Sequence, residues 1–235
     1  MILPTTRAPK GCNTCARERH CLLGRLPSDV HRLWQPHITE KSFHKGELLL
    51  QQGRIATELK IIKVGTALVL RQGEDGLQRP VGLFGSAQTL GSAALLGEPA
   101  QLSCQAIAPG RACVVPIETI ERLGLVDVAL LQALAAGYAR SQAQLADWAH
   151  IVRIRGATGQ LAAALLLLAR VQGSSLVRLP SHAILADLLA TTRETIARSL
   201  RSLAQQDGVL RRDRWHCEIH APALLALSAA GRAPR

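Results

Sequence analysis

The hydrophobic pattern of the chain changes its period at about residue 118, and this change limits the possible folds more than any other feature. Within residues 40–117, short apolar runs alternate with glycine turns, as in the run 59–64 that ends at Gly65. Short strands at such spacing indicate a small β-barrel or β-sandwich. Within residues 118–154 the apolar residues recur at helical spacing. The pattern therefore predicts an α+β protein whose β-rich domain precedes a helical part.

One stripe of seven residues follows the predicted long helix in alternating steps of three and four. Ser141 is its polar member, and the others are Leu131, Leu134, Tyr138, Leu145, Trp148 and Val152. This heptad-like spacing is typical of the seam of a two-stranded coiled coil. The alternative is a helix that packs the stripe on its own domain. The stripe predicts a homodimer, with Ser141 as a position that weakens the pairing.

From residue 155 onward the pattern predicts helices followed by a short β-hairpin. The expected helices are 156–171, 181–189 and 193–205, and the expected strands are 209–210 and 216–219. Ser181 and Thr192 occupy cap positions, so the last two helices match a helix-turn-helix. The alternative is two core helices with a solvated arginine face. Pro222 and residues 231–235 are expected to form a frayed tail.

The charge of the chain indicates what this helical region binds. Lys and Arg number 28 against 17 Asp and Glu, a net charge of +11 that favours a polyanionic partner. Residues 191–235 contain eight arginines and four acidic residues. The longest apolar run, 161–169, is too short to span a membrane, and no amphipathic anchor accompanies the charge. Double-stranded DNA is therefore the predicted partner, and a membrane is not.

The cysteine spacing near the N-terminus predicts a soft-metal site. Cys12 and Cys15 form a CxxC motif, and Cys21 follows after five residues. Three thiolates in a short stretch suit a metal whose fourth ligand comes from elsewhere in the fold. The spacing alone leaves open zinc, an iron–sulfur cluster and redox-switching thiols. No secretory signal is recognised, so we expect a reducing cytoplasm, where clustered cysteines act as ligands more often than as structural disulfides.

Residues 192–198, Thr-Arg-Glu-Thr-Ile-Ala-Arg, resemble the recognition helix of the CRP/FNR family of bacterial transcription regulators. The order of the parts resembles that family over nearly the whole chain. The resemblance implies a cysteine-rich cluster-binding segment at 1–24, a cupin-like β-roll sensor domain at 25–120 that is similar to cyclic-nucleotide-binding domains, a dimerisation helix at 121–154, and a winged helix-turn-helix DNA-binding domain at 155–235. It also implies a cytoplasmic regulator, not an enzyme, that binds a palindromic operator as a homodimer and contacts RNA polymerase.

The resemblance assigns roles on the outward face of the recognition helix. The DNA-facing residues are Thr192, Arg193, Glu194, Ala197, Arg198 and Arg201. Glu194 would accept a hydrogen bond from cytosine N4, and Arg198 would donate to guanine O6 and N7. Arg193 resembles an arginine that binds a further guanine or a phosphate. Ala197 stands where the FNR branch has serine, and Ala190 takes a turn position often filled by glycine.

The C-x₂-C-x₅-C pattern resembles the cluster motif of the oxygen-sensing FNR branch, whose fourth ligand precedes a short proline-containing segment. The resemblance implies an oxygen-labile [4Fe–4S] cluster bound by Cys12, Cys15, Cys21 and Cys113. It implies that the intact cluster favours the dimer and DNA binding. Cys104 competes for the fourth position, although packing suits Cys104 and Cys217 better. The alternatives are a regulator that uses zinc, thiol oxidation, NO or haem and, more distantly, an iron–sulfur electron-transfer protein.

The cyclic-nucleotide branch of the family holds the ribose phosphate with a Gly-Glu pair and an arginine. The matching stretches here have Ser92 in place of the glutamate and Leu102 in place of the arginine. A buried phosphate without that arginine lacks its charge partner, so no cyclic nucleotide is expected. The chain also lacks the P-loop, the nucleophile-elbow motif and the HExxH motif, which argues against an enzyme.

Overall fold

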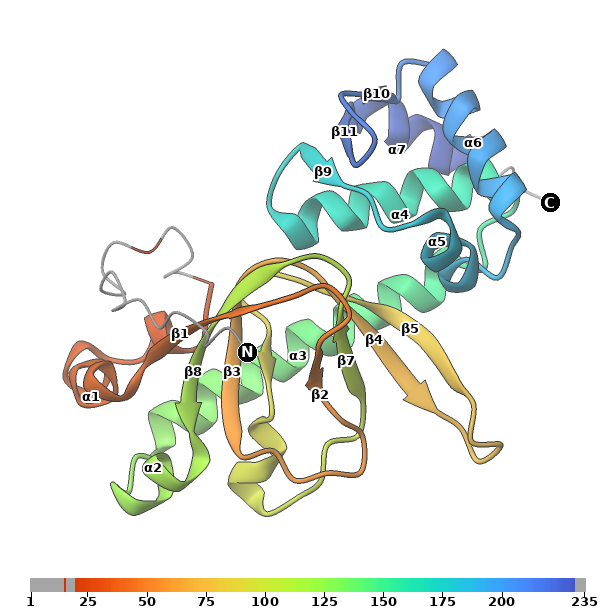
Figure 1. Cartoon of the computed structure of the whole chain (residues 1–235). Helices are drawn as coiled ribbons and strands as arrows, with labels where there is room; N and C mark the ends of the chain where they lie inside the picture. Colours follow the sequence, from red (N-terminus) through yellow and green to blue (C-terminus); the bar gives the residue numbers. More distant parts are fainter. Residues whose placement is uncertain (1–14, 16–19, 231–235) are drawn as a thin grey trace. The chain divides into compact units, whose positions relative to one another are not determined.

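The structure is a computed structural model that describes residue 15 and residues 20–230 (Figure 1). It contains a β-rich part, a long helix α3 (Val128–Ile151) and a helical C-terminal part, which confirms the predicted α+β architecture. The chain divides into two compact units, the first formed by Met1–Gln78 and Phe84–Gln142, and the second by Arg79–Leu83 and Ala143–Arg235. The boundary between the units therefore falls within α3.

Two antiparallel sheets form the β-rich part. The first sheet has the order β1-β8-β3-β6, with β1 Thr39–Phe43, β8 Gly110–Pro116, β3 Glu58–Val64 and β6 Thr89–Leu90. The second has the order β2-β7-β4-β5, with β2 Leu48–Leu50, β7 Ser103–Ala106, β4 Ala67–Gln72 and β5 Gln78–Phe84. Gly110 begins β8 beside the Val64 carbonyl and the Phe43 ring. A Cβ there would lie 2.2 Å from the Val64 oxygen, so no side chain fits at this position.

A helical layer precedes the first strand and covers part of the first sheet. It consists of the 3₁₀ turn η2 (Leu23–Arg25), helix α1 (Ser28–Trp34) and the 3₁₀ turn η3 (Gln35–His37). Its apolar side chains join the first sheet and the start of α3 in one core cluster, which includes Leu22, Leu23, Trp34, Ile61, Val115, Leu130, Ala133 and Leu134. Full burial of a leucine, isoleucine or valine side chain stabilises the fold by about 1.5–3 kcal/mol. The cluster therefore fixes Leu22, and with it the end of the cysteine-rich segment, against the sheet.

The turn η4 (Ser92–Leu96) and helix α2 (Ile117–Arg122) complete the first unit. Pro116 ends β8 and is the N-cap residue of α2, where its missing N–H costs no hydrogen bond. Gly91 precedes η4 with φ of 84°, a conformation that favours glycine.

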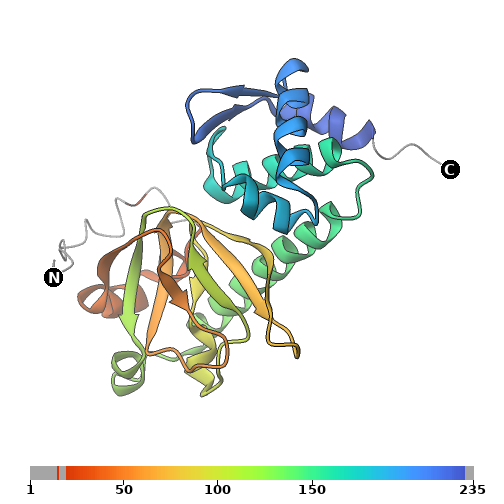
Figure 2. The ribbon, with the colours of Figure 1, turned by 45° about the vertical axis from the view of Figure 1, so that its right-hand side comes forward.

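The second unit contains a winged helix-turn-helix. Its elements after α3 are α4 (Ala157–Gln172), β9 (Leu176–Arg178), α5 (His182–Leu188), α6 (Arg193–Gln205), β10 (Val209–Arg211), β11 (His216–Ile219) and α7 (Ala221–Ala230). The three strands form an antiparallel sheet of order β10-β11-β9. Figure 2 shows the β10–β11 hairpin projecting from the helices of this unit. The buried core includes Leu161, Leu165, Leu168, Leu185, Ile196 and Leu203.

The prediction of a frayed tail is wrong at Pro222, because residues 221–230 form α7. Pro222 lies in the first turn of this helix, where proline is tolerated because the first N–H groups have no partner within the helix. Leu224 is fully buried, so packing on the second unit stabilises this short helix. Residues 231–235 lie outside the described residues. Among the described helices, none is both long and apolar enough to cross a membrane.

Candidate DNA-binding interface and cysteine site

Side-chain caps begin both helices of the predicted helix-turn-helix. The Ser181 hydroxyl accepts a hydrogen bond from the Ile184 N–H at 3.3 Å, at the start of α5. The Thr192 hydroxyl accepts one from the Thr195 N–H at 3.2 Å, at the start of α6. Between them Ala190 has φ of 49°, the left-handed conformation that explains why glycine is common there. The turn therefore forms with alanine, at a cost in backbone strain.

Helix α6 separates an apolar inner face from a basic outer face, as predicted. Ile196 and Leu203 are fully buried, and Leu200 is 5% exposed. The outer side chains with exposed positions are Thr192, Arg193, Glu194, Arg198 and Arg201, and Ala197 is half-buried. The outer face presents three guanidinium groups on one helix, which suits bidentate hydrogen bonds to guanine or phosphate.

Glu194 has hydrogen bonds that keep its side chain charged. Its own backbone N–H and then the Thr192 side chain lower the pKa of this carboxyl below its usual range. Its place in the first turn of α6 also favours a negative charge. At neutral pH the group is therefore a hydrogen-bond acceptor, the role that a contact with cytosine N4 needs.

The wing is more elaborate than the sequence pattern suggested. The predicted hairpin exists, and β9 adds a third strand that pairs Arg178 with His216. At the tip Asp213 accepts hydrogen bonds from the N–H groups of Trp215 (2.6 Å) and His216 (2.8 Å). These bonds, with the His216 side chain, lower the pKa of Asp213 to about 2. The guanidinium of Arg214 lies 4.9 Å from the centre of the Trp215 ring.

This wing tip was not identified as a functional surface from the sequence. The signal that could have found it is the run of arginines 211, 212 and 214 beside one tryptophan. Arg212 is fixed by a hydrogen bond from its Nε to Glu218, at 2.8 Å. The hairpin therefore holds a second basic surface on the unit that carries α6.

The predicted dimer stripe on α3 is divided by packing within the chain. Leu134 is 9% exposed in the core cluster of the first unit. Trp148 is 3% exposed, and together with Leu145 it leaves no room for a Cβ on Gly82 of β5. The positions that stay exposed are Leu131 at 44%, Tyr138 at 49% and Val152 at 39%. The dimer seam stays a prediction, but Leu134 and Trp148 already have partners in their own chain.

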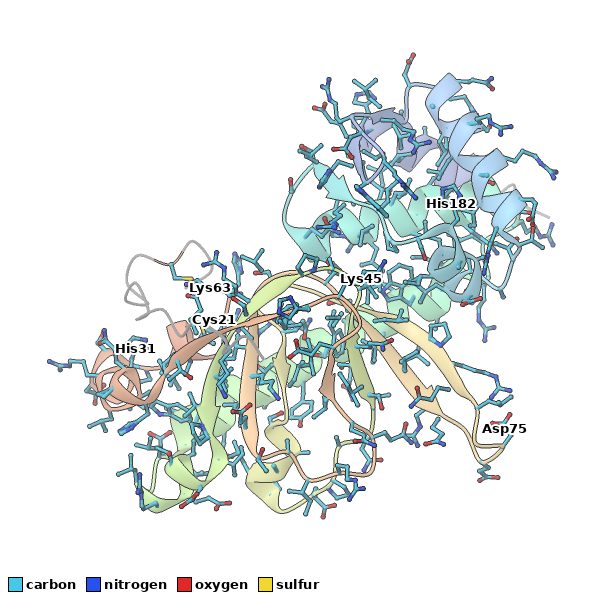
Figure 3. The ribbon with its side chains drawn as sticks, viewed as in Figure 1. Cys21, His31, Lys45, Lys63, Asp75 and His182 are labelled. Carbon is cyan, nitrogen blue, oxygen red and sulfur yellow. The ribbon has the colours of Figure 1, made fainter. Side chains whose placement is uncertain are left out.

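The fold brings three of the four proposed cysteine ligands to one part of the first unit. Cys21 and Cys113 both pack against the core cluster that contains Leu22 and Val115. The Sγ atom of Cys21 accepts a hydrogen bond from the Gly24 N–H at 3.3 Å. Cys15 and Cys113 both lie close enough to Lys63 to raise the pKa of its ammonium group, although hydrogen bonding to Glu40 is the largest cause. Figure 3 draws Cys21 and Lys63 on the same flank of the roll.

The described part of the chain does not contain a preassembled metal site. Among residue 15 and residues 20–230, no three Cys, His, Asp or Glu side chains are gathered as a metal would require. The fourth proposed ligand, Cys12, lies outside the described residues. The donor set nevertheless suits a soft metal, because Cys15, Cys21 and Cys113 are half-buried and no disulfide joins them to one another.

The two remaining cysteines have the surroundings of packing residues. Cys104 lies on β7 of the other sheet and is 1% exposed, and burial raises the pKa of its thiol to about 12. Cys217 is fully buried on β11 of the second unit, and burial raises its pKa to about 11. Neither thiol belongs to the core cluster against which Cys21 and Cys113 pack, so Cys113 is the cysteine that shares its surroundings with Cys21.

Ser92, which stands where the cyclic-nucleotide branch carries its glutamate, is hydrogen-bonded to α3. Ser92 is 8% exposed, and its hydroxyl donates to the Tyr138 hydroxyl of α3 at 2.9 Å. Nearby, the Ser141 hydroxyl donates to the Gln88 side chain at 2.7 Å. These bonds connect the loops of the roll to α3.

Comparisons with known proteins agree with this division of the chain. Residues 40–125 match the family model described as a cyclic nucleotide-binding domain, and residues 159–227 match the Crp-like helix-turn-helix domain. A curated relative, the Cyclic AMP receptor protein of Thermus thermophilus, is 28% identical over 212 residues. The match covers 89% of this chain and 96% of the relative.

Two solved structures have the same fold over most of the chain. FixK2 from Bradyrhizobium japonicum is 22% identical, with a TM-score of 0.69, and the match covers 82% of this chain and 98% of that one. TTHB099, a CRP-family transcriptional regulator from Thermus thermophilus, is 19% identical, with a TM-score of 0.63 and coverage of 80% and 96%. These matches extend through both the β-rich part and the winged helix-turn-helix.

Proposed function

Because the chain belongs to the CRP/FNR family of DNA-binding transcription regulators, we propose that an oxygen-labile [4Fe–4S] cluster controls its dimerisation and its binding to DNA. The ligands would be Cys12, Cys15, Cys21 and Cys113. The DNA would be a palindromic operator, read in the bacterial cytoplasm by two copies of α6, with RNA polymerase as the next partner. The half-sites would lie about 34 Å apart, one turn of the double helix.

One observation carries the sensing part of this proposal. Cys21 and Cys113 are far apart in the sequence and pack against one core cluster, to which α3 contributes Leu130, Ala133 and Leu134. The same cluster therefore contacts two proposed ligands and the predicted dimerisation helix. A change at the ligands is thus coupled to α3 through packed side chains, which have few alternative arrangements.

The residues of the chain would hold the cluster in two different ways. The β ladder fixes Cys113 between β1 and β3. Cys21 is fixed by the buried Leu22 that follows it and by the hydrogen bond from Gly24. When bound, the cluster supplies an inorganic core that oxygen degrades. The thiolates would bind it, and the removal of that link would alter how Leu22 and Leu23 pack with the residues of α3 in the core cluster.

Anaerobic purification tests the cluster directly. The protein should be brown, with a broad absorbance at about 400 nm and bound iron and sulfide. Admission of air should bleach this absorbance and weaken the binding of a palindromic duplex. A colourless protein with one tightly bound zinc would contradict the proposal and favour the zinc alternative.

Cyclic nucleotide binding is the second candidate, because of the domain match and the name of the Thermus thermophilus relative. Two features argue against it here. Ser92 is hydrogen-bonded to Tyr138, and Leu102 takes the place of the phosphate-binding arginine. We expect no thermal stabilisation of the protein by cyclic AMP, measured by calorimetry at saturating nucleotide. A clear rise in Tm would show that the protein binds the nucleotide through other groups.

A further inference from the structure

Packing within the chain uses one edge of the stripe that the sequence predicts for the dimer seam. Leu134 is 9% exposed and Trp148 is 3% exposed. Between them, the Ser141 hydroxyl donates to the Gln88 side chain at 2.7 Å. These three positions of α3 are seven residues apart, so they lie along one line of the helix. That line already contacts its own chain, and a seam centred on it would have to break these contacts.

The side of α3 that stays exposed lies one residue further along. Ala135, Gln142 and Ala149 follow the three covered positions, and all of them are exposed. One heptad before Ala135, Val128 is 70% exposed. Because successive residues are about 100° apart around a helix, this exposed line is turned away from the covered one. Together with the exposed part of the predicted stripe it forms an outer stripe, whose members are Val128, Leu131, Ala135, Tyr138, Gln142 and Ala149.

The outer stripe has no charged residue, although it faces solvent in the single chain. With histidine neutral, the charged residues of α3 are Arg140 and Asp147, seven residues apart on a different side of the helix. Asp147 pairs with Arg170 of α4 at 3.5 Å. A helix at the surface of a globular protein normally carries its charged residues on the solvent side. The absence of charge from the outer stripe therefore indicates that another surface covers it.

A second copy of the chain fits this face. Two-fold pairing sets each residue of the stripe against the same residue of the other copy, so the stripe must be compatible with itself. An uncharged stripe creates no repulsion between like charges. Its members lie three and four residues apart, with Leu145 between Gln142 and Ala149, which is the spacing of a two-stranded coiled coil. At 24 residues, α3 is about 36 Å long, which is enough for about three heptads.

We propose that a second copy of this chain pairs with α3 through the outer stripe, and that the two Gln142 amides hydrogen-bond to each other across the two-fold axis. This pairing rests on the function proposed above, which requires a homodimer. An amide side chain has both donors and an acceptor, so it can pair with its own copy. A single polar residue at such a position fixes the register of the two helices and weakens the dimer. Gln142, and not Ser141, is thus the polar position that weakens the pairing.

The two polar positions distinguish the outer stripe from the predicted one. Gln142→Leu should tighten the dimer of the full-length protein by about tenfold, or about 1.4 kcal/mol, because leucine packs in a seam without a polar group to satisfy. Ser141→Ala should leave the dimer dissociation constant unchanged. Sedimentation equilibrium of the protein purified in air measures both constants. A Gln142→Leu dimer no tighter than wild type, or an equally tightened Ser141→Ala dimer, would overturn the proposal.

A charge on the outer stripe gives the opposite test, with a matched control. In the Gln142→Leu background, Ala135→Glu sets two carboxylates against each other and should weaken the dimer by about tenfold. Ala143→Glu adds the same charge to an exposed alanine of α3 outside the stripe, and it should have no effect. Circular dichroism checks that both variants keep their helix content. Equal weakening by the two substitutions would overturn the proposal.

These measurements separate the pairing face from the cluster. A wild-type protein without iron would contradict the proposed cluster, and the Gln142→Leu dimer would still decide which face of α3 pairs. An oxygen-labile iron centre in a protein whose dimer does not respond to Gln142→Leu would leave the proposed function standing and overturn the pairing through the outer stripe.

Discussion

The proposed DNA-facing side chains of α6 all come from residues 192–201, whereas the proposed cysteine site combines Cys15 and Cys21 with Cys113 of β8. On α6, one helical turn sets the spacing of the arginines, and the buried Ile196 and Leu203 set their direction. At the proposed cysteine site, the first sheet, the helical layer and α3 must all pack before Cys21 and Cys113 lie against one core cluster. In a site built from one helix, a substitution removes one contact and leaves the others in place. In a site assembled from distant segments, the loss of any one segment disrupts the whole site.

The largest expected effect is at the assembled site. Cys113→Ala should abolish iron binding and the oxygen dependence of DNA binding, because one of four ligands is lost. Cys104→Ala is the matched control, since it removes a buried thiol from the other sheet and should leave the iron content unchanged. Iron and sulfide analysis of both anaerobic proteins measures the difference. Loss of iron in Cys104→Ala alone would reverse the ligand assignment.

A substitution on the outer face of α6 should remove one contact with DNA and leave the others unchanged. Arg198→Ala should weaken binding to the preferred operator by about 1–3 kcal/mol and relax the preference at one base pair. Fluorescence anisotropy with operator variants measures the loss at fixed salt. Arg170→Ala, which removes a largely exposed arginine of α4, should leave base preference unchanged. Unaltered base preference in Arg198→Ala would show that this side chain does not read the DNA.

The turn of the local site offers a stabilising change. Ala190→Gly should stabilise the second unit by about 1 kcal/mol, because alanine with φ of 49° pays a steric cost that glycine avoids. Urea unfolding measures this change. Ala197→Gly on α6 is the comparison and should destabilise by up to about 1 kcal/mol, since its conformation is helical. A loss of stability in Ala190→Gly would mean that the turn is not strained.

The smallest effect is expected from acid at the wing tip. The pKa of Asp213 is lowered to about 2, mainly by the Trp215 N–H, so its bonds stabilise the folded wing when the carboxylate is charged. The contribution is complete above the unfolded pKa of about 4 and is lost as pH falls through about 2. Amide chemical shifts of Trp215 and His216 should follow this titration. Asp213→Asn should remove the pH dependence, and a Trp215 shift that titrates near pH 4 would contradict it.

Residue patterns alone identified the order of the parts and the two faces of α6, and they predict a soft-metal donor set. These are local properties, because helical and strand periods, caps and ligand spacing depend on residues that are close together in the sequence. The pattern missed β9 and α7, since β9 has only three residues and α7 begins with a proline in its first turn. Both are stabilised by contacts with distant parts of the second unit.

Tertiary packing determines which of these side chains are covered and which remain exposed. The stripe on α3 is visible in the sequence, but only the fold shows that Leu134 and Trp148 are covered within the chain while Leu131 and Tyr138 remain exposed. Likewise, Cys104 and Cys113 are equivalent as thiols in the sequence, and the two sheets place them in different surroundings. Glu40, Lys63 and Arg111 are distant in the sequence, and the register of β1 and β3 against β8 brings them together. A period predicts which residues share a face, and tertiary structure determines what that face contacts.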